Sequence, residues 1–399
     1  MFKACEQESC ISDGPGGSGS NYDRGDMDVV SFCAQSHVLI VAGKGGVGKT
    51  TMAAAIARMA STTGRSVLIV ELEGKSGITG AFGLAEDLGY DEVELQAEDA
   101  PRQGWIRARR ITPDDALVEY LQDHGLRRVS KRLVSSGVVD VVSTAIPGIR
   151  DVLVLGKIKQ LERGEVADLI VVDAPATGHA ITFLTSASGL VSAARGGPLR
   201  SQAQEVVELL GDPTRCQVIL VTLPEEMPVS ETIESAYTLE DRAGVQLGPV
   251  IVNACDPVPE GLARTAEDVA ATAGIAMDSG HLEALEAARR FRLDRHALSA
   301  EQIERLAREL PLPHLLVPAL AADAIGPAET ETLAHALADA VAELDQASDQ
   351  ASDQASDAAS DHPPDDAAPD ATPDAAPHHA PGPADAPPDH ASDPAVGAT

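Results

Sequence analysis

The stretch that decides the fold is GKGGVGKTT, Gly43 to Thr51, which directly follows the apolar run 37–42. It fits the phosphate-binding loop pattern G-x-x-x-x-G-K-[ST]. Its glycines let the backbone curl until successive N–H groups point at one phosphate chain. Lys49 then reaches the β- and γ-phosphates, and the Thr50 hydroxyl is placed to ligate Mg²⁺. The helix that opens here points its positive end at the same anion.

The surroundings of this loop agree with the motif. An apolar strand candidate, 38–41, precedes the loop, and an Ala-rich helix candidate, 52–59, follows it. A turn at 63–65 and a second apolar strand, 67–70, complete one βαβ unit. The sequence therefore predicts a hydrolase of nucleoside triphosphates with Mg²⁺ at the phosphates. Its expected nucleotide-binding residues are Gly43, Gly45, Gly46, Val47, Gly48, Lys49, Thr50 and Thr51.

A second motif, DLIVVDAPATGHA, begins at Asp168. Asp173 stands at the carboxyl end of a buried-strand pattern, the Walker B position, where an aspartate holds Mg²⁺ through water opposite Thr50. We expect residues 174–178 to form a loop of small residues. Gly178 in that loop is predicted to offer its N–H to a γ-phosphate, which would make the loop a sensor of hydrolysis.

Two further strand ends carry polar side chains. Glu71 and Glu73 end the second strand, and one of them is expected to orient the attacking water. Strand alternation points both to the same side, so spacing does not choose between them. Asn253 follows the apolar run 250–252, and its amide can donate to and accept from an adenine edge.

Composition narrows the class of protein. The chain has 399 residues, of which 44% are hydrophobic and only 3% aromatic. No run approaches the roughly 18 apolar residues of a membrane helix, and the first 35 residues lack a secretory apolar region. The five cysteines form no C-x-x-C pair, which argues against a disulfide framework or a zinc site. We therefore expect a cytoplasmic protein without stable membrane insertion.

Charge excludes some partners. The formal net charge is −32, and from Asp345 onward the chain has twelve Asp but no Lys or Arg. Such a chain repels nucleic acid and anionic lipid, so neither is an expected partner. Two basic clusters stand out, and we interpret them as a solvated helix face. They are Arg107, Arg109 and Arg110, and then Arg127, Arg128, Lys131 and Arg132.

We predict three segments. Residues 1–35 are rich in Gly, Ser and Asp and are expected to be disordered, with either Met1 or Met27 as the true start. Residues 36–345 form the folded domain. Residues 346–399 begin with the repeat ASDQ-ASDQ-ASD and are expected to be a disordered acidic tail of unassigned role, because they offer almost no branched apolar side chains for burial.

Inside the folded domain, short apolar strands alternate with helical patterns. This alternation predicts an α/β fold of the P-loop NTPase class, a mostly parallel sheet covered by helices on both faces. Such sheets bind ligands at the carboxyl ends of their strands. Further strands are expected at 105–109, 169–172, 218–221, 250–252 and 315–317, and helices at 113–121, 202–210 and 282–291.

These motifs, in this order, resemble the ArsA-like family of deviant Walker A ATPases. That family includes the arsenite-pump ATPase and the ATPase that targets tail-anchored membrane proteins. The likeness covers residues 36–345 and looks closest to the ArsA-like proteins of high-GC Gram-positive bacteria, in which two paralogues can occur together. The matching segments are GKGGVGKTT, AIPGIRDVLVLGKI, DAPATGH, RGGPLRSQAQ, LPEEMPVSET and VIVN.

The resemblance implies a dimer with ATP at a face-to-face interface. Lys44, an extra lysine in the loop, would reach across to the partner's phosphates in the manner of an arginine finger. The implied catalytic set is Lys44, Glu73 and Asp173, with Mg²⁺ held by Thr50 and Asp173 and adenine read by Asn253. Glu73 stands where the family has an Asp that positions the water. The Glu side chain is one methylene longer than that Asp.

Two departures from the family leave the client open. The arsenite enzyme binds metalloid through several cysteines, but we expect only Cys216 and Cys255 in the folded region. The targeting enzyme has a Met-rich insert after the second switch, whereas residues 180–224 are short and lack Met.

Three functions follow, in order of preference. The first is a dimeric ATP-hydrolysing switch that acts on a protein client, as a homodimer or with a paralogous ATPase. The second is a nucleotide-binding subunit of such a heterodimer with negligible turnover of its own. The third is a positioning ATPase of the MinD type, which would need a basic amphipathic helix at the C-terminus that this acidic tail does not offer.

Overall fold

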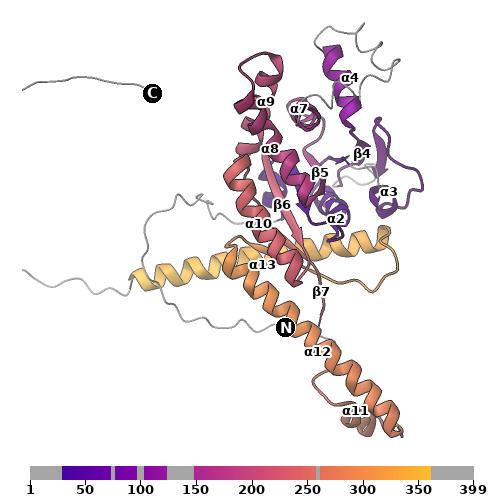
Figure 1. Cartoon of the computed structure of the whole chain (residues 1–399). Helices are drawn as coiled ribbons and strands as arrows, with labels where there is room; N and C mark the ends of the chain where they lie inside the picture. Colours follow the sequence, from indigo (N-terminus) through magenta and orange to yellow (C-terminus); the bar gives the residue numbers. More distant parts are fainter. Residues whose placement is uncertain (1–28, 73–76, 97–102, 124–147, 258–260, 361–399) are drawn as a thin grey trace, which may run out of the picture. The chain divides into compact units, whose positions relative to one another are not determined.

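The computed structural model describes residues 29–72, 77–96, 103–123, 148–257 and 261–360 (Figure 1). The chain divides into two units, Met1–Ser352 and Asp353–Thr399. The elements described below lie in the first unit, except that the end of helix α13 (Pro327–Ser360) belongs to the second. Across these described ranges, no helix is both long and apolar enough to cross a bilayer.

Within the described residues, eight strands form one sheet in the order β3-β4-β2-β5-β1-β6-β7-β8. Neighbouring strands are parallel, apart from β3, which pairs antiparallel with β4 at one edge. β1 and β6 are buried at every position, which explains their largely apolar sequences. The strands are β1 (Val38–Gly43), β2 (Val67–Glu71), β3 (Val93–Gln96), β4 (Ile106–Arg110), β5 (Leu169–Ala176), β6 (Cys216–Thr222), β7 (Val250–Cys255) and β8 (His314–Pro318).

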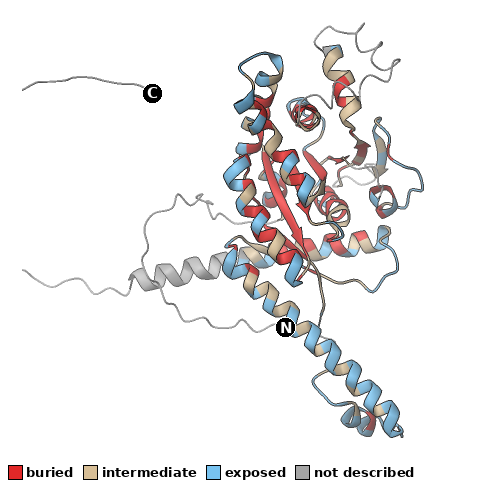
Figure 2. Cartoon of the chain, viewed as in Figure 1, coloured by how far each residue is buried: buried red, intermediate tan, exposed pale blue. Residues whose placement is uncertain are grey.

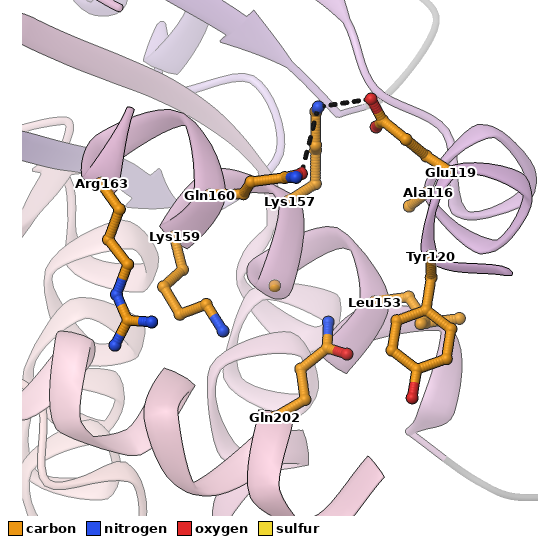
Figure 3. A pocket seen from close by; sticks show the side chains of 10 residues that line it. Ala116, Glu119, Tyr120, Leu153, Lys157, Lys159, Gln160, Arg163 and Gln202 are labelled. Carbon is orange, nitrogen blue, oxygen red and sulfur yellow. Dashed lines mark hydrogen bonds and ion pairs between the residues drawn. The ribbon is translucent and has the colours of Figure 1, made fainter. Parts of the chain in front are cut away.

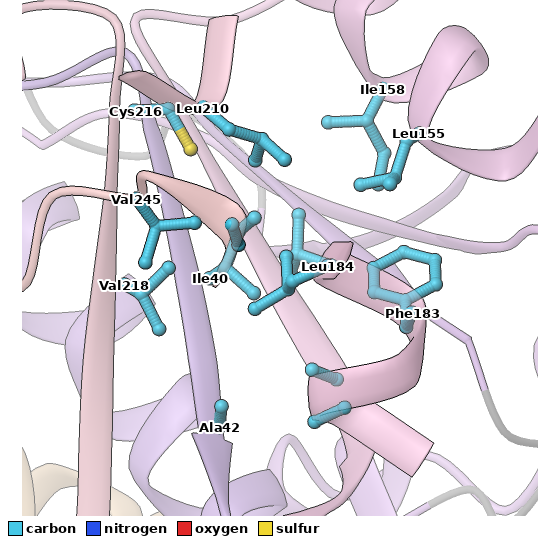
Figure 4. Packing of buried hydrophobic residues seen from close by; sticks show 14 of the residues in the cluster. Ile40, Ala42, Leu155, Ile158, Phe183, Leu184, Leu210, Cys216, Val218 and Val245 are labelled. Carbon is cyan, nitrogen blue, oxygen red and sulfur yellow. The ribbon is translucent and has the colours of Figure 1, made fainter. Parts of the chain in front are cut away.

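Helices cover both faces of the sheet, and the alternation of strand side chains divides the core into two clusters. Ile40 and Ala42 of β1 pack on one face, where Figure 4 shows Ile40 beside Leu184, while Leu39 packs on the other. The first face is covered by α4 (Pro113–Asp123), α7 (Ile149–Arg163), α8 (Thr177–Ala193), α9 (Pro198–Gly211) and α10 (Glu226–Ala243). The second is covered by α1 (Val29–Ala34), α2 (Lys49–Thr62), α3 (Gly77–Ala81) and α13.

The strand order brings the two phosphate-site motifs together. The chain runs from β1 through α2 to β2, but the place between these two strands is filled by β5. As a result Asp173 is in register with Val41 on one side and with Glu71 on the other. Because parallel strands end at the same edge, the loop after β1 and Asp173 lie at one edge of the sheet. The predicted α/β fold of the P-loop class is confirmed.

Two helices after β7 form a region of a different kind, here called the α11–α12 arm (residues 266–309). α11 (Ala266–Ala273) packs against α12 (Ser279–Glu309), and α12 packs against α10. Only Leu306 of α12 is fully buried, and Figure 2 shows most of the arm exposed. The sequence predicted a helix only at 282–291. The apolar periodicity of α12 is weak because most of this helix is exposed to solvent, so the predicted helix was too short.

The structure corrects both predicted boundaries of disorder. Residues 29–34 form α1, because Phe32 and Cys33 are buried in the core cluster that contains α2. At the other end α13 continues past residue 345 to Ser360. Leu337 and Val341 anchor this helix to the sheet, and the Ala-containing repeat extends a helix that packing has already nucleated. Residues 1–28 and 361–399 lie outside the described residues.

The basic cluster that we interpreted as a solvated helix face lies instead on β4. Arg109 is buried, with its guanidinium over the ring of Tyr90 at 4.4 Å, and Arg107 lies over Trp105 at the same distance. Stacking on aromatic faces and pairing with carboxylates let arginines occupy a strand near the sheet edge. The second basic cluster, 127–132, lies outside the described residues.

Candidate functional site

The phosphate-binding loop connects β1 to α2 and is shaped by its glycines. Gly48 caps α2 with φ of 94°, a left-handed conformation that favours glycine, and a Cβ there would lie 2.3 Å from the Asn253 amide nitrogen. A Cβ on Gly46 would meet nothing within 4 Å. The loop is thus closely packed on one side and open on the other, as a cradle for a phosphate chain requires.

The first turn of α2 is suited to an anion. No side chain caps its N-terminus and no acid lies in its first turn, among the residues described. The Lys49 ammonium donates to the Lys44 carbonyl oxygen at 3.1 Å, so it already lies over the loop. Thr50 and Thr51 follow in the same turn, half-buried. Backbone N–H groups, the helix dipole and one ammonium therefore converge on the open side.

Thr50 and Asp173 lie together, as the sequence predicted. The Thr50 hydroxyl donates to Asp173 Oδ2 at 2.6 Å, and Asp173 is buried. A hydroxyl and a carboxylate are the hard oxygen donors that Mg²⁺ prefers. In the described part of the chain, no three His, Cys, Asp or Glu side chains cluster as a metal cage. That donor set fits Mg²⁺, which is commonly held by one or two protein oxygens together with substrate phosphates.

The chain continues differently from the prediction after Asp173. We expected a loop over 174–178, but β5 extends to Ala176 and α8 begins at Thr177. Pairing of Ala176 with Gly43 extends the sheet, and the small side chains there fit beside the phosphate loop. Gly178 is exposed in the first turn of α8. Its proposed contact with a γ-phosphate stays a prediction, now made from a helix N-terminus.

Of the two candidate acids at the end of the second strand, the structure describes one, Glu71, which is the last residue of β2. Glu71 is 1% exposed, and Arg110 Nε donates to one of its oxygens at 3.4 Å. Burial raises the pKa of Glu71, Arg110 opposes this effect, and the neighbouring Asp173 adds to it. Glu71 is therefore enclosed behind the site. Glu73 lies outside the described residues.

Asn253 lies within β7 rather than after it. Its amide nitrogen donates to the Val47 carbonyl at 2.8 Å, and its oxygen accepts from Ala254 N–H at 2.8 Å. Ala254 has φ of 56°, a left-handed conformation that is unusual for alanine. Asn253 thus links β7 to the phosphate loop and helps to fix the position of Val47. Nothing in the sequence indicated this contact, and its predicted role with adenine stays a prediction.

Lys44 contacts Glu231, a residue for which the sequence predicted no role. Its ammonium lies 2.6 Å from Glu231 Oε1, on α10. Glu231 belongs to LPEEMPVSET, one of the segments that carried the resemblance. A carboxylate in a shared segment was the available signal, but the pairing depends on how α10 packs.

A second hollow, of about 230 Å³, lies between α4, α7 and α9 (Figure 3). Two lysines line it, but each already has a carboxylate: Lys157 lies 2.7 Å from Glu119, and Lys159 lies 2.8 Å from Glu205. No residue of the phosphate loop lines this hollow. The candidate nucleotide site is therefore the crevice at the loop.

The described cysteines do not form a thiolate site. None of Cys33, Cys216 and Cys255 forms a disulfide in the described part of the chain, and Cys33 is a buried residue that we had placed in a disordered segment. Burial raises the pKa of the Cys216 thiol to about 12 and that of Cys255 to about 11. Both groups are therefore thiols at neutral pH, and across the described residues no three His, Cys, Asp or Glu side chains cluster as a metal site.

Comparisons with known proteins agree with this geometry. Residues 36–193 match the ArsA ATPase family, described as anion-transporting ATPases. ATPase BagA of Mycobacterium tuberculosis is 40% identical over 240 residues, which cover 57% of this chain and 68% of that protein. A putative arsenical pump-driving ATPase of Halobacterium salinarum is 24% identical over 73% of this chain and 43% of its own length. ATPase get3 of Schizosaccharomyces japonicus is 28% identical over 41% of this chain and 50% of its own.

Proposed function

The chain belongs to the ArsA-like family of ATPases, and from this premise we propose that it binds and hydrolyses ATP as a two-subunit switch that acts on a protein partner. The observation that carries the proposal is the contact between Thr50 and Asp173 beside an open phosphate loop. It brings two motifs that are far apart in the sequence to one point, in the arrangement that phosphoryl transfer needs.

In this proposal the loop and the first turn of α2 bind the triphosphate. N–H groups of 45–50 surround the β-phosphate, and Lys49 exchanges its carbonyl contact for phosphate oxygens. Thr50 and Asp173 hold Mg²⁺, which when bound supplies positive charge against the phosphates. Asn253 keeps the loop in shape during the exchange, because its amide nitrogen donates to the Val47 carbonyl oxygen.

The chemical step then requires two more groups. Glu73 orients the attacking water, since Glu71 is enclosed behind the site. Lys44 comes from the opposite subunit and stabilises the charge of the transition state. Lys44 stands at the rim of the crevice with its side chain one-third exposed, which supports a role toward a second subunit.

A protein partner is supported by the surface of the α11–α12 arm. Six of the twelve large apolar side chains that are exposed among the described residues lie in this short region. Concentrated apolar exposure marks interaction surfaces. The six are Val269, Ile275, Met277, Leu285, Phe291 and Leu298. The protonated, separate cysteines give no comparable support for a metalloid.

Phosphate release by the purified full chain with Mg²⁺ and ATP tests the proposal. We expect Asp173→Asn to reduce the rate by about a hundredfold, since it replaces a charged metal-site oxygen. The matched control is Asp241→Asn, an exposed residue on α10, which should retain the wild-type rate. Equal rates for Asp173→Asn and wild type would overturn the assignment. ATP binding without turnover by the wild type would instead favour a subunit that works with a paralogous ATPase.

A further inference from the structure

An ion pair between Lys44 and Glu231 ties the phosphate loop to α10. Its atoms are 2.6 Å apart, and the two side chains are 33% and 34% exposed. Lys44 is held at its other end as well, because its carbonyl accepts from Lys49. The chain alone therefore gives the Lys44 side chain a defined position over its own loop.

Glu231 is carried on a firmly placed helix. Val229 and Thr232, its near neighbours on α10, are buried, and α10 packs against β6 and α8. The carboxylate thus projects from a fixed backbone towards a loop whose own shape is fixed by Gly48 and Asn253. Because both ends are rigid, the pair is a built feature of this crevice and needs little rearrangement to form.

We propose that Glu231 is a positioning residue for Lys44: it holds the ammonium over its own loop in the single chain and releases it when a second subunit brings its ATP. This inference rests on the proposed function, in which Lys44 acts across the interface. The reason for release is charge. A carboxylate 2.6 Å from the ammonium would lie next to the partner's phosphates if the pair persisted, and like charges at that range repel.

Pairing of two subunits then exchanges two Lys44–Glu231 contacts for two contacts with phosphate. Without nucleotide, breaking the two ion pairs is not compensated by contacts between Lys44 and phosphate. Glu231 therefore opposes pairing of empty subunits. Glu231→Gln keeps the size of the side chain and removes its charge. It should favour the nucleotide-bound dimer by about five- to twentyfold, because two partly exposed pairs break and each contributes about two- to fivefold to an equilibrium constant.

Sedimentation velocity of the full chain with Mg²⁺ and a non-hydrolysable ATP analogue measures this effect. We expect Glu231→Gln to pair at about five- to twentyfold lower protein concentration than wild type. Glu234→Gln, an exposed acid on the same helix, is the matched control and should behave as wild type. Glu231→Asp, which keeps the charge, should restore the wild-type concentration at least in part, an outcome that a merely structural role does not predict.

The outcomes separate the inference from the proposed function. If Lys44→Ala weakens pairing but Glu231→Gln pairs as wild type or more weakly, the inference is wrong and the proposed function stands. If Lys44→Ala pairs as wild type, or if wild type does not pair with the analogue, the role of Lys44 across the interface is wrong and the inference falls with it. Equal melting temperatures of the four variants exclude misfolding as the cause.

Discussion

The edge of the sheet at the phosphate loop, here called the phosphate edge, and the α11–α12 arm differ in which kinds of side chain they bury. At the phosphate edge, Asp173 and Glu71 are carboxyl groups enclosed by packed strands. In the arm, Phe291 and Leu298 are apolar groups exposed to water. Burying carboxyl groups in the first region costs free energy. Leaving apolar side chains exposed in the second region gives up the free energy that their burial would contribute. Both departures from ordinary burial support the proposed function, the first its chemistry and the second its contact with a protein partner.

The comparison predicts the largest contrast for two phenylalanines. Phe183, on the helix α8 that follows Asp173 and β5, is buried, and Phe183→Ala should lower the free energy of unfolding by about 3–5 kcal/mol. Phe291 is 61% exposed, and Phe291→Ala should change it by less than about 0.5 kcal/mol. Urea unfolding of both variants measures the difference. A cost above about 2 kcal/mol for Phe291→Ala would show that the arm is packed rather than open.

Two glycines with positive φ give the next contrast. At Gly48 a Cβ would lie 2.3 Å from the Asn253 amide nitrogen, whereas at Gly274, after α11, it would meet nothing within 4 Å. Gly274→Ala should cost about 1 kcal/mol from backbone strain alone, and Gly48→Ala about 2–4 kcal/mol from strain and overpacking. Calorimetry with and without ATP should show that only Gly48→Ala also loses nucleotide binding. Equal costs would mean that Asn253 moves aside freely.

The smallest effect is a pH dependence of opposite sign for two carboxylates. The Arg289 side chain and the Ala266 N–H lower the pKa of Glu286 in the arm to about 2. Its contribution to stability is therefore present above its ordinary value of 4.5 and is lost as the pH falls towards 2. Burial raises the pKa of Glu71, so stability from this group is greatest below 4.5 and falls as the pH rises through the raised pKa.

Melting temperatures of Glu71→Gln and Glu286→Gln between pH 3 and pH 8 test these signs. Relative to wild type, Glu71→Gln should gain as the pH rises. Glu286→Gln should be at a disadvantage at neutral pH that shrinks as the pH falls. Parallel profiles for both variants would contradict the difference in burial from which the two shifts are argued.

The elements that depend on local sequence pattern could be predicted from the sequence. Apolar runs that are buried on both faces located β1, β5 and β6, and the glycine spacing located the phosphate loop. The match of Asp173 with Thr50 also followed, because parallel strands must end at one edge. In each case the physical cause lies within a few residues of the motif.

The missed parts depend on neighbours that are distant in the sequence. The brace from Asn253 to Val47 and the pair between Lys44 and Glu231 require β7 and α10 to be placed first. The stacking of Arg109 on Tyr90 likewise depends on the edge of the sheet. Composition also misled at α13, whose repeat resembles a disordered segment when read alone but here extends a packed helix.

The insertion of β5 between β1 and β2 also orders events in time. During synthesis the ribosome releases β1 and β2 early, yet they cannot pair with each other in the native sheet, since the place between them belongs to a strand made much later. Closing this gap is a long-range step, which is slow in folding. Until it closes, Thr50 has no Asp173 beside it. Capture of ATP on the ribosome would therefore begin only after residue 176 has emerged, and binding of the nucleotide would stabilise the newly completed sheet.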